Sequence, residues 1–305
     1  MDSVVRVPQL ASGYFPFWTR WIRAITNFFC MCVVYASQLF WGQCELYRIC
    51  AQPTNDLRSM MVRFRTSVAL DSELKETKEA IFGFETFETD QVLDSIVQQK
   101  RIDFSSNKIA ESNMRQCLKK FKAVNGVYAK VFKLRDESYD SKNEKHEEML
   151  EELWENLKPG VRRTGGRYTK EWGEIGFQGE DPMTDFRSMG ILSLHQLNYF
   201  TKNYGEEAKR ALVHSCHPTS WYPFAVTGIN ITNFIAELIK DRLLDSRMYD
   251  KDADITELHE FYCSIYSMFD ALWVESNPTD LMAFPMIFNH LKSTVRYELM
   301  ERSFA

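Results

Sequence analysis

The segment from Trp172 to Phe200 constrains this chain more than any other part of its sequence. It reads WGEIGFQGEDPMTDFRSMGILSLHQLNYF, a dense, non-repetitive run of Gly, Pro, Asp and aromatic residues around one arginine, Arg187. The glycines permit turns that other residues rarely adopt, and Pro182 excludes the interior of a regular element. A helical pattern resumes at Ile191. The segment therefore predicts a turn-rich loop between two helices that presents a guanidinium, a common way to build a functional surface.

Apolar residues recur at spacings of three and four along most of the remaining chain, as in helices that bury one face. The clearest stripes run from Ile109 to Phe132, from Met149 to Leu157 and from Leu258 to Trp273. Strand alternation and hairpin dipeptides are nearly absent. The sequence therefore predicts an all-α fold, in which a multi-helix domain follows a helical N-terminal region and a hydrophobic leader.

Two signals near the C-terminus predict where helices begin. Asp254 and Glu257 stand at capping-box spacing before the last apolar stripe, so a helix is expected to start there. Asn277-Pro278 is typical of the start of the next helix. Pro285 would then kink that helix early, because its ring clashes with the preceding turn.

The N-terminal region departs from this pattern. From Ala24 to Cys44 no Asp, Glu, Lys or Arg occurs over 21 residues, and Arg20 and Arg23 precede the run. That length suffices to span a bilayer, and the aromatic residues near its ends resemble an interfacial belt. Several Thr, Asn, Ser and Gln residues nevertheless make it weakly apolar. Two interpretations stay open: attachment to an internal membrane, by insertion or in-plane docking, and a helix buried against the domain.

The sequence predicts three parts: a hydrophobic segment at 1–50, a helical region at 51–134 and the motif-bearing domain at 135–305. A polar linker is expected from Arg135 to His146. A second connection, from Arg162 to Arg167, holds three arginines, and we assign it a structural role.

Composition limits the function classes. A net charge of −5 gives no reason to expect nucleic acid as a partner. The seven cysteines are scattered, without a CxxC pair, which favours reduced thiols and a cytoplasmic location. His214, Cys216 and His217 lie together, but no second ligand pair follows at zinc-finger spacing, so no metal site is predicted. Without a Walker A loop or kinase signature, the chain is expected to need no cofactor of its own.

The segment that begins at Trp172 resembles the signature of the ELMO domain, W-x3-G-F-Q-G-x-D-P-x-T-D-F-R. Ser188 and Ser193 stand where the family usually has Gly. The chain length is similar to that of the ELMO-domain-containing (ELMOD) group rather than the larger ELMO scaffolds. The matching residues are Trp172, Gly176, Phe177, Gln178, Gly179, Asp181, Pro182, Thr184, Asp185, Phe186 and Arg187, with further matches at His217-Pro218, Gly228 to Thr232, Phe261 to Cys263 and, more weakly, Cys44 to Arg48.

The resemblance covers roughly residues 135–300 and implies a GTPase-activating protein for GTP-bound Arf and Arf-like small GTPases. Arg187 would be the catalytic residue, supplied in trans as an arginine finger. The other motif residues would support the loop or contact the partner: Trp172, Gly176, Phe177, Gln178, Gly179, Asp181, Pro182, Asp185 and Phe186.

The residues alone leave alternatives open. Asp181 or Asp185 could hold the Arg187 guanidinium ready for a GTPase, or such a pair could merely brace the loop. Gln178 could serve loop structure or help to position the attacking water. At the level of the whole protein, the alternative to a GTPase activator is a non-catalytic helical adaptor that binds a small GTPase or a membrane component.

Overall fold

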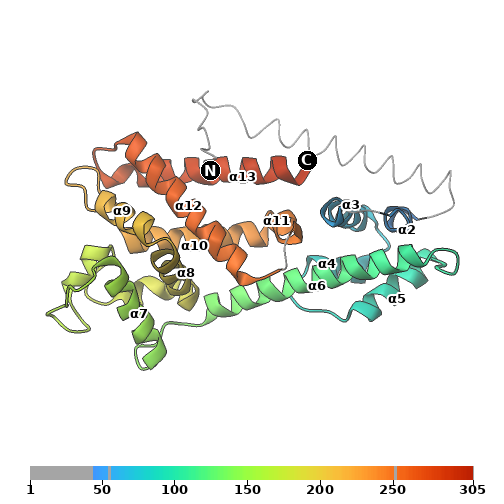
Figure 1. The fold of residues 1–305 in the computed structure, drawn as a ribbon, viewed down its shortest axis with the longest axis horizontal. Helices are drawn as coiled ribbons and strands as arrows, with labels where there is room; N and C mark the ends of the chain where they lie inside the picture. Colours follow the sequence, from blue (N-terminus) through green and yellow to red (C-terminus); the bar gives the residue numbers. More distant parts are fainter. Residues whose placement is uncertain (1–43, 54–55, 251–252, 305) are drawn as a thin grey trace.

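A computed structural model describes residues 44–53, 56–250 and 253–304 (Figure 1). Every regular element in these ranges is a helix, which confirms the predicted all-α fold. The α-helices and the three short 3-10 helices, labelled η, are α2 (Glu45–Cys50), α3 (Leu57–Leu70), α4 (Lys75–Phe82), α5 (Thr89–Lys100), α6 (Lys108–Asp136), α7 (Glu144–Leu157), η1 (Lys170–Ile175), η2 (Pro182–Arg187), α8 (Gly190–Asn203), α9 (Gly205–Ser215), α10 (Phe224–Lys240), α11 (Asp245–Asp250), α12 (Ile255–Ser276), η3 (Leu281–Ala283) and α13 (Phe284–Phe304).

The uncharged N-terminal run from Ala24 to Cys44 lies outside the described residues, apart from Cys44 itself. Both interpretations of that run therefore remain predictions. Within the ranges that the structure describes, no helix combines the length and the apolarity that crossing a bilayer requires.

The 29-residue helix α6 runs through much of the length of the molecule (Figure 1). Asn107 caps its start, because the Asn107 side chain accepts hydrogen bonds from the backbone N–H groups of Ile109 and Ala110 at 3.0 and 3.1 Å. The first part of α6 packs against α2 and α5, and its other end lies beside α8. One helix therefore contacts both the N-terminal helices and the motif-bearing part of the chain.

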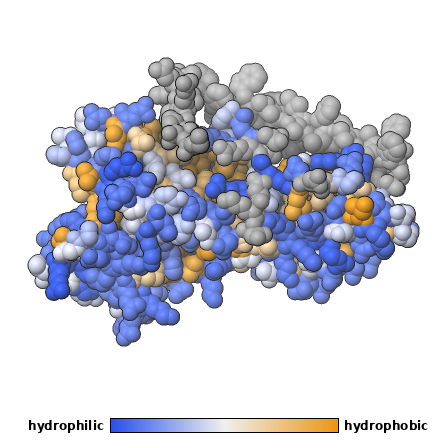
Figure 2. Space-filling view, viewed as in Figure 1, coloured by the Kyte–Doolittle hydropathy of each residue, from blue (hydrophilic) through white to orange (hydrophobic). Residues whose placement is uncertain are grey.

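Helix α8 lies at the centre of the motif-bearing part, where it contacts α6, α7, α9, α10 and α12. Most of its side chains are buried, including the polar Gln196 and Asn198, so it is surrounded rather than half-exposed. The surface differs: Figure 2 shows hydrophilic residues over most of the face in view, with hydrophobic residues in small patches between them. The apolar stripes of the sequence thus face a shared core.

Of two expected helix boundaries, one agrees with the structure and the other does not. The Asp254 side chain accepts from the Thr256 backbone N–H at 3.4 Å and caps α12, as expected. The prediction that Asn277-Pro278 starts a helix is wrong, because Asn277 ends α12 in the left-handed region, with φ of 40°. Helix α13 begins at Phe284, so Pro285 falls in its first turn, where a missing N–H leaves no bond unmade.

The loop between α6 and α7 covers residues 137–143 and is shorter than the expected linker, because helical structure extends into it from both sides. The domain boundary expected between residues 134 and 135 falls inside α6, two residues before its end at Asp136. The division of the chain into three parts remains a prediction.

A buried arginine at the end of α10 joins the C-terminal half of the chain to the N-terminal helices. Arg242 is only 7% exposed. Its Nη1 and Nη2 groups donate to the Asn125 side-chain oxygen of α6, each at 3.0 Å, and Nη2 also donates to the Gly83 carbonyl after α4. The guanidinium lies over the rings of Phe84 and Tyr128, at 4.6 and 5.2 Å from their centroids.

The carboxylate of Asp245, 2% exposed, balances the Arg242 charge at 3.6 Å. It also accepts a hydrogen bond of 3.0 Å from the Tyr128 hydroxyl and lies 3.6 Å from the Arg65 guanidinium of α3. Side chains from α3, α6 and α11 therefore meet in one polar centre, here called the Arg242 centre. It fixes the N-terminal helices against the rest of the fold.

Candidate functional site

The motif loop, residues 172–190, contains most of η1, a connecting turn and η2. One glycine fixes the turn before η2, and another fixes the chain just after η2. Gly176 has φ of 82°, and a Cβ there would overlap the Phe224 backbone nitrogen at the start of α10. The Gly176 carbonyl accepts from the Val226 N–H at 3.2 Å. Only glycine combines this φ with so close an approach. The turn before η2 is therefore held against α10.

Gly190 makes the second close approach, just after η2. Its φ is 51°, and a Cβ would overlap the carbonyl oxygens of Arg135 and Glu137 at the end of α6. The next residue, Ile191, donates its N–H to the Glu137 carbonyl at 2.8 Å. Because η2 lies between these two contacts, its backbone is positioned by both α10 and α6.

Aromatic side chains fill the space beneath the loop. Trp172, Phe177 and Phe186 are all buried, and Trp172 is completely so. Phe177 lies edge-on to Trp172 at 6.0 Å and to Phe186 at 5.5 Å between ring centroids. Phe186 stacks on Tyr139 at 5.2 Å, and the Trp172 Nε1 donates to the Arg167 carbonyl at 2.8 Å. The three motif aromatics thus form one continuous cluster that ties both halves of the loop to the core.

The two motif aspartates stabilise the loop rather than the arginine. Asp181 caps η2 by accepting from the Met183 N–H at 3.0 Å, and its carboxylate pairs with Arg167 at 2.9 Å. Asp185 accepts from the Gln178 N–H at 2.8 Å. The pairing of Arg187 with either aspartate, which the sequence left open, is absent among the described residues. Pro182, buried at the first position of η2, supplies a residue without an N–H to satisfy.

Arg187 lies at the last position of η2, with its side chain exposed. It makes no hydrogen bond or ion pair with any residue in the described ranges. Its charge still reaches the half-buried Asp185: burial and the nearby Asp181 raise the pKa of the Asp185 carboxyl, while the Gln178 N–H and Arg187 act in the lowering direction. The backbone that carries the guanidinium is fixed at several points, and the guanidinium itself is available to a partner.

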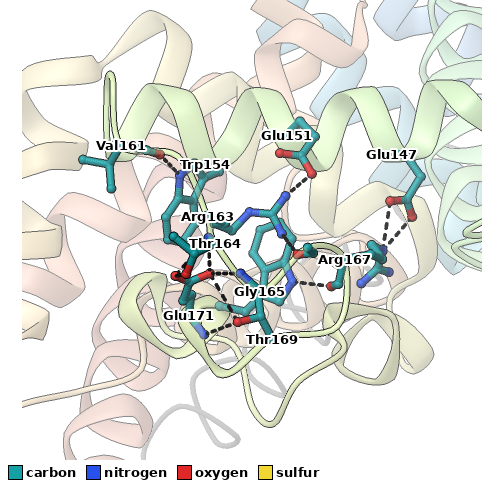
Figure 3. A network of polar contacts seen from close by, with 12 residues as sticks. Glu147, Glu151, Trp154, Val161, Arg163, Thr164, Gly165, Arg167, Thr169 and Glu171 are labelled. Carbon is teal, nitrogen blue, oxygen red and sulfur yellow. Dashed lines mark hydrogen bonds and ion pairs between the residues drawn. The ribbon is translucent and has the colours of Figure 1, made fainter.

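The connection from Arg162 to Arg167 is braced by α7 (Figure 3). The Arg163 guanidinium lies over the Trp172 ring, 3.7 Å from its centroid, and pairs with Glu151. Arg167 pairs with Glu147 at 2.9 Å in addition to Asp181. These contacts support the structural role that the sequence assigned to two of the three arginines.

Glu171 stabilises the same connection, residues 162–167. Its carboxylate accepts from the backbone N–H groups of Thr164 and Gly165, at 2.9 and 3.1 Å, and from the hydroxyls of Thr164 and Thr169 (Figure 3). These donors favour the charged form and lower the pKa of Glu171 to about 2. The Thr169 N–H donates to the Glu180 carbonyl at 3.0 Å, so the connection also supports the motif loop.

Sequence reasoning missed the acidic side chains of α7 and Glu171 as supports of the loop. For the acidic side chains of α7 the sequence held a usable signal, because Glu147 and Glu151 are four residues apart and so lie on one face of a helix. For Glu171 no comparable signal exists, since its donors are backbone groups that only the folded connection brings together.

The histidine and cysteine run at the end of α9 has packing roles. The His214 Nδ1 lies 2.9 Å from the Asp270 carboxylate, and the His217 Nδ1 accepts from the Ser220 N–H at 3.1 Å. Across residues 44–53, 56–250 and 253–304, no group of three or more His, Cys, Asp or Glu side chains is arranged to hold a metal ion.

The two residues that depart from the motif, Ser188 and Ser193, are compatible with the backbone at their positions. Ser188 has φ of −85° and ψ of −33°, ordinary values that need no glycine. Ser193 is buried, and its hydroxyl donates to the Gly190 carbonyl at 2.9 Å. Neither serine disturbs the backbone that presents Arg187.

Comparison with known proteins agrees with this geometry. The model of the ELMO/CED-12 family matches residues 129–288, a range that contains the motif loop and the end of α6 that receives Gly190. This chain belongs to the ELMO/CED-12 family.

Relatives in this ELMO/CED-12 family match over most of the chain. ELMO domain-containing protein 2 of Homo sapiens is 33% identical over 275 residues, which cover 89% of this chain and 87% of that protein. ELMO domain-containing protein 1 of Bos taurus is 32% identical over 308 residues, or 93% of each chain. ELMO domain-containing protein B of Dictyostelium discoideum is 33% identical over 264 residues, covering 86% of this chain and 92% of that protein. The likeness therefore extends to the N-terminal helices as well as the motif-bearing part.

Proposed function

We propose that this protein is a GTPase-activating protein for small GTPases of the Arf and Arf-like group, and that Arg187 is its catalytic residue. One observation carries the proposal: an exposed guanidinium, without a hydrogen bond or ion pair among the described residues, ends a short helix whose backbone is held on both sides. The Arf and Arf-like assignment rests on the motif resemblance.

The chemistry of GTP hydrolysis suits such a group. The reaction builds negative charge on the γ-phosphoryl group and on the oxygen that bridges it to the β-phosphate. A planar, permanently charged guanidinium can donate to two of these oxygens at once, and an arginine supplied in trans raises the rate about 10³–10⁵-fold. The partner GTPase supplies the nucleotide and its Mg²⁺, so this chain needs no cofactor.

The loop also has the rigidity that the role requires. A guanidinium contributes to catalysis only if it is held near its working position before the reaction. Gly176 and Gly190 fix the backbone on either side of η2, and Phe186 anchors it from below. Because the backbone at Arg187 is already fixed, little further conformational freedom of the backbone would be lost when the Arg187 side chain enters the nucleotide site.

A single-turnover assay across a panel of Arf and Arf-like GTPases tests the proposal. GTP-loaded GTPases are mixed with excess parent protein, the Arg187→Ala variant or Arg210→Ala, a matched exposed arginine on α9 whose nearest carboxylate lies 3.7 Å away. We expect the parent and Arg210→Ala to stimulate at least one GTPase and Arg187→Ala to lose that activity. If Arg187→Ala is folded and as active as the parent, the protein is instead a non-catalytic adaptor.

The membrane part of the proposal rests on the uncharged run from Ala24 to Cys44 alone. We propose that this run attaches a cytoplasmic protein to an internal membrane, where it would meet membrane-bound GTPases. Carbonate extraction separates insertion from peripheral docking. Full-length protein that stays in the soluble fraction throughout would contradict attachment.

A further inference from the structure

Four exposed polar or charged side chains of the motif loop make no hydrogen bond or ion pair within the described part of the chain: Gln178, Glu180, Arg187 and Ser188. Two other exposed residues have partners: Thr184 donates its hydroxyl to the Asp181 carbonyl at 2.9 Å, and Glu174 pairs with Lys158. Of the four, Glu180 is an anion and would repel the phosphate oxygens of GTP. Ser188 offers only a short hydroxyl, whereas Gln178 is neutral, longer, and offers both amide donors and an acceptor. Gln178 is therefore the side chain best suited to act beside Arg187.

The positions of Gln178 and Arg187 are coupled by two adjacent contacts. The first is between the neighbouring rings of Phe177 and Phe186, which lie edge-on at 5.5 Å. The second is the 2.8 Å hydrogen bond from the Gln178 N–H to the Asp185 carboxylate. Because Phe186 and Asp185 are the two residues before Arg187, the segment bearing Gln178 is attached to the helix bearing the arginine at two successive residues.

The backbone on either side of Gln178 leaves little freedom to rearrange. Gly176 is held against α10, as described above, and Phe177 is 5% exposed within the aromatic cluster. Gly179 follows with φ of 73°, which turns the chain away immediately. The Gln178 main chain is thus fixed while its side chain projects into solvent.

We propose that Gln178 is a second catalytic residue of this loop and that Asp185 is a positioning residue that acts through it. The inference rests on the proposed GTPase-activating function. In the complex, the Gln178 amide would donate to an oxygen of the γ-phosphoryl group while Arg187 meets the charge that develops toward the leaving group. Asp185 would hold the Gln178 backbone in place for that contact and would not touch the nucleotide.

The test compares single-turnover GTP hydrolysis by the parent protein with four variants: Gln178→Ala, Asp185→Ala, Asp185→Asn and the control Glu180→Ala. Removal of one preorganised donor to a developing oxyanion typically costs about 10²–10³-fold in rate. We expect a fall of roughly 10²-fold for Gln178→Ala in the rate at saturating protein, with the half-saturating concentration little changed. Glu180→Ala should be at least as fast as the parent, because it removes an anion and no donor.

The two Asp185 variants distinguish a positioning role of the Asp185 side chain from a role of its negative charge. Asparagine keeps an oxygen that can accept the Gln178 N–H, so Asp185→Asn should retain most of the activity, whereas Asp185→Ala should lose it. Because Asp185 acts through Gln178, the double variant Gln178→Ala/Asp185→Ala should be no slower than the slower single variant. If Asp185→Asn falls as far as Asp185→Ala, the positioning role is wrong.

A binding measurement gives an independent outcome. Complexes with the GTPase loaded with GDP and aluminium fluoride, which mimics the transferring phosphoryl group, should weaken for Gln178→Ala more than complexes with the GDP form alone. Loss of activity in Arg187→Ala together with full activity in Gln178→Ala would overturn this inference and leave the proposed function intact. A parent protein that stimulates no GTPase would overturn both.

Discussion

Two arginines of this protein occupy opposite environments. Arg242 is 7% exposed, donates to Asn125 and Gly83, lies over two aromatic rings and faces a buried carboxylate. Arg187 is exposed and, among the described residues, has no hydrogen bond or ion pair. Both are held on well-fixed backbone. What differs is whether the fold supplies partners for the guanidinium.

The backbone of Arg242 shows how much its side chain contributes. Arg242 has φ of 57°, and its N–H and that of Leu243 donate back to Ile239 and Leu238, the pattern that normally places glycine after a helix. An arginine in this conformation carries a backbone cost that glycine avoids. The contacts of the Arg242 centre must offset that cost. At Arg187 the described residues supply no such contacts, which supports the proposal that its guanidinium serves an interaction outside the chain.

The largest effect is expected for Arg187, on turnover and not on stability. Arg187→Ala should lower stimulated GTP hydrolysis about 10³–10⁵-fold. Arg187→Lys should fall nearly as far, because an ammonium cannot donate to two phosphate oxygens in the geometry of a planar fork. The free energy of unfolding in urea should change by less than about 0.5 kcal/mol. An Arg187→Ala variant that unfolds readily would erase the contrast with Arg242.

The next effect concerns Arg242 and the stability of the fold. Arg242→Ala should lower the free energy of unfolding by about 3–5 kcal/mol, because it removes one of the two cations beside the buried Asp245 carboxylate and leaves the Asn125 oxygen and the Gly83 carbonyl without their donor. Arg242→Gly loses the same contacts but relieves the left-handed backbone, so it should be less destabilising than Ala by about 1 kcal/mol. Urea unfolding of the three proteins measures both differences. A glycine variant as stable as the parent would mean that the Arg242 contacts do no more than offset the backbone cost.

A third prediction uses pH to probe a buried side chain that, unlike Arg242, has lost its charge. His259 of α12 stacks on Tyr199, and burial lowers its pKa to about 4. The unfolded chain, with an ordinary histidine pKa of about 6.5, takes up the proton first as pH falls. Stability from this group is therefore complete above pH 6.5 and is lost between about 6.5 and 4, by at most about 3 kcal/mol.

The matched variant for this titration is His259→Phe, which keeps a ring against Tyr199 and cannot be protonated. The His259 Nδ1 has no hydrogen-bond partner among the described residues, so replacing it with an apolar ring breaks no bond at that atom. Urea unfolding at several pH values should show a smaller loss of stability below pH 6.5 for the variant. Identical pH profiles would show that His259 is not protonated on unfolding.

The smallest effect is expected at Ser188, beside the arginine. Its backbone angles are ordinary, so Ser188→Gly relieves no strain and should lower the free energy of unfolding by no more than about 1 kcal/mol. Stimulated hydrolysis should stay at the parent level. A marked gain in activity would show that the Ser188 side chain hinders the approach of the GTPase.

The sequence predicted the helices well because their information is local. Periodic apolar residues gave the stripes of α6, α7 and α12, and Asp254 caps α12 through the neighbouring Thr256. The error at Asn277 has a physical cause. An Asn-Pro pair can end one helix or begin the next, and the choice depends on whether the Asn takes the left-handed conformation, as it does here.

The site was predictable only in part. Its aromatic residues could be expected to face the core from their chemistry, but the partners of Asp181 and Asp185 depend on which backbone groups the folded loop brings near them. Arg163 and Arg167 looked alike in sequence, yet one stacks on Trp172 and the other pairs with Asp181. The local spacing of Arg242 and Asp245 is compatible with an ion pair, but the bonds from Arg242 to Asn125 and Gly83 have no local signal, because they span more than a hundred residues of the chain.

The length of α6 restricts how chains of this kind can diverge by insertion and deletion. A helix of 29 residues is about 44 Å long, and one added residue rotates everything beyond it by roughly 100°. Such a change would turn Asn125 away from Arg242 or carry the Arg135 carbonyl away from Gly190. Loops 101–107 and 137–143, at the two ends of α6, can vary in length without that penalty. Within α6, only steps of about seven or eleven residues would restore the buried face.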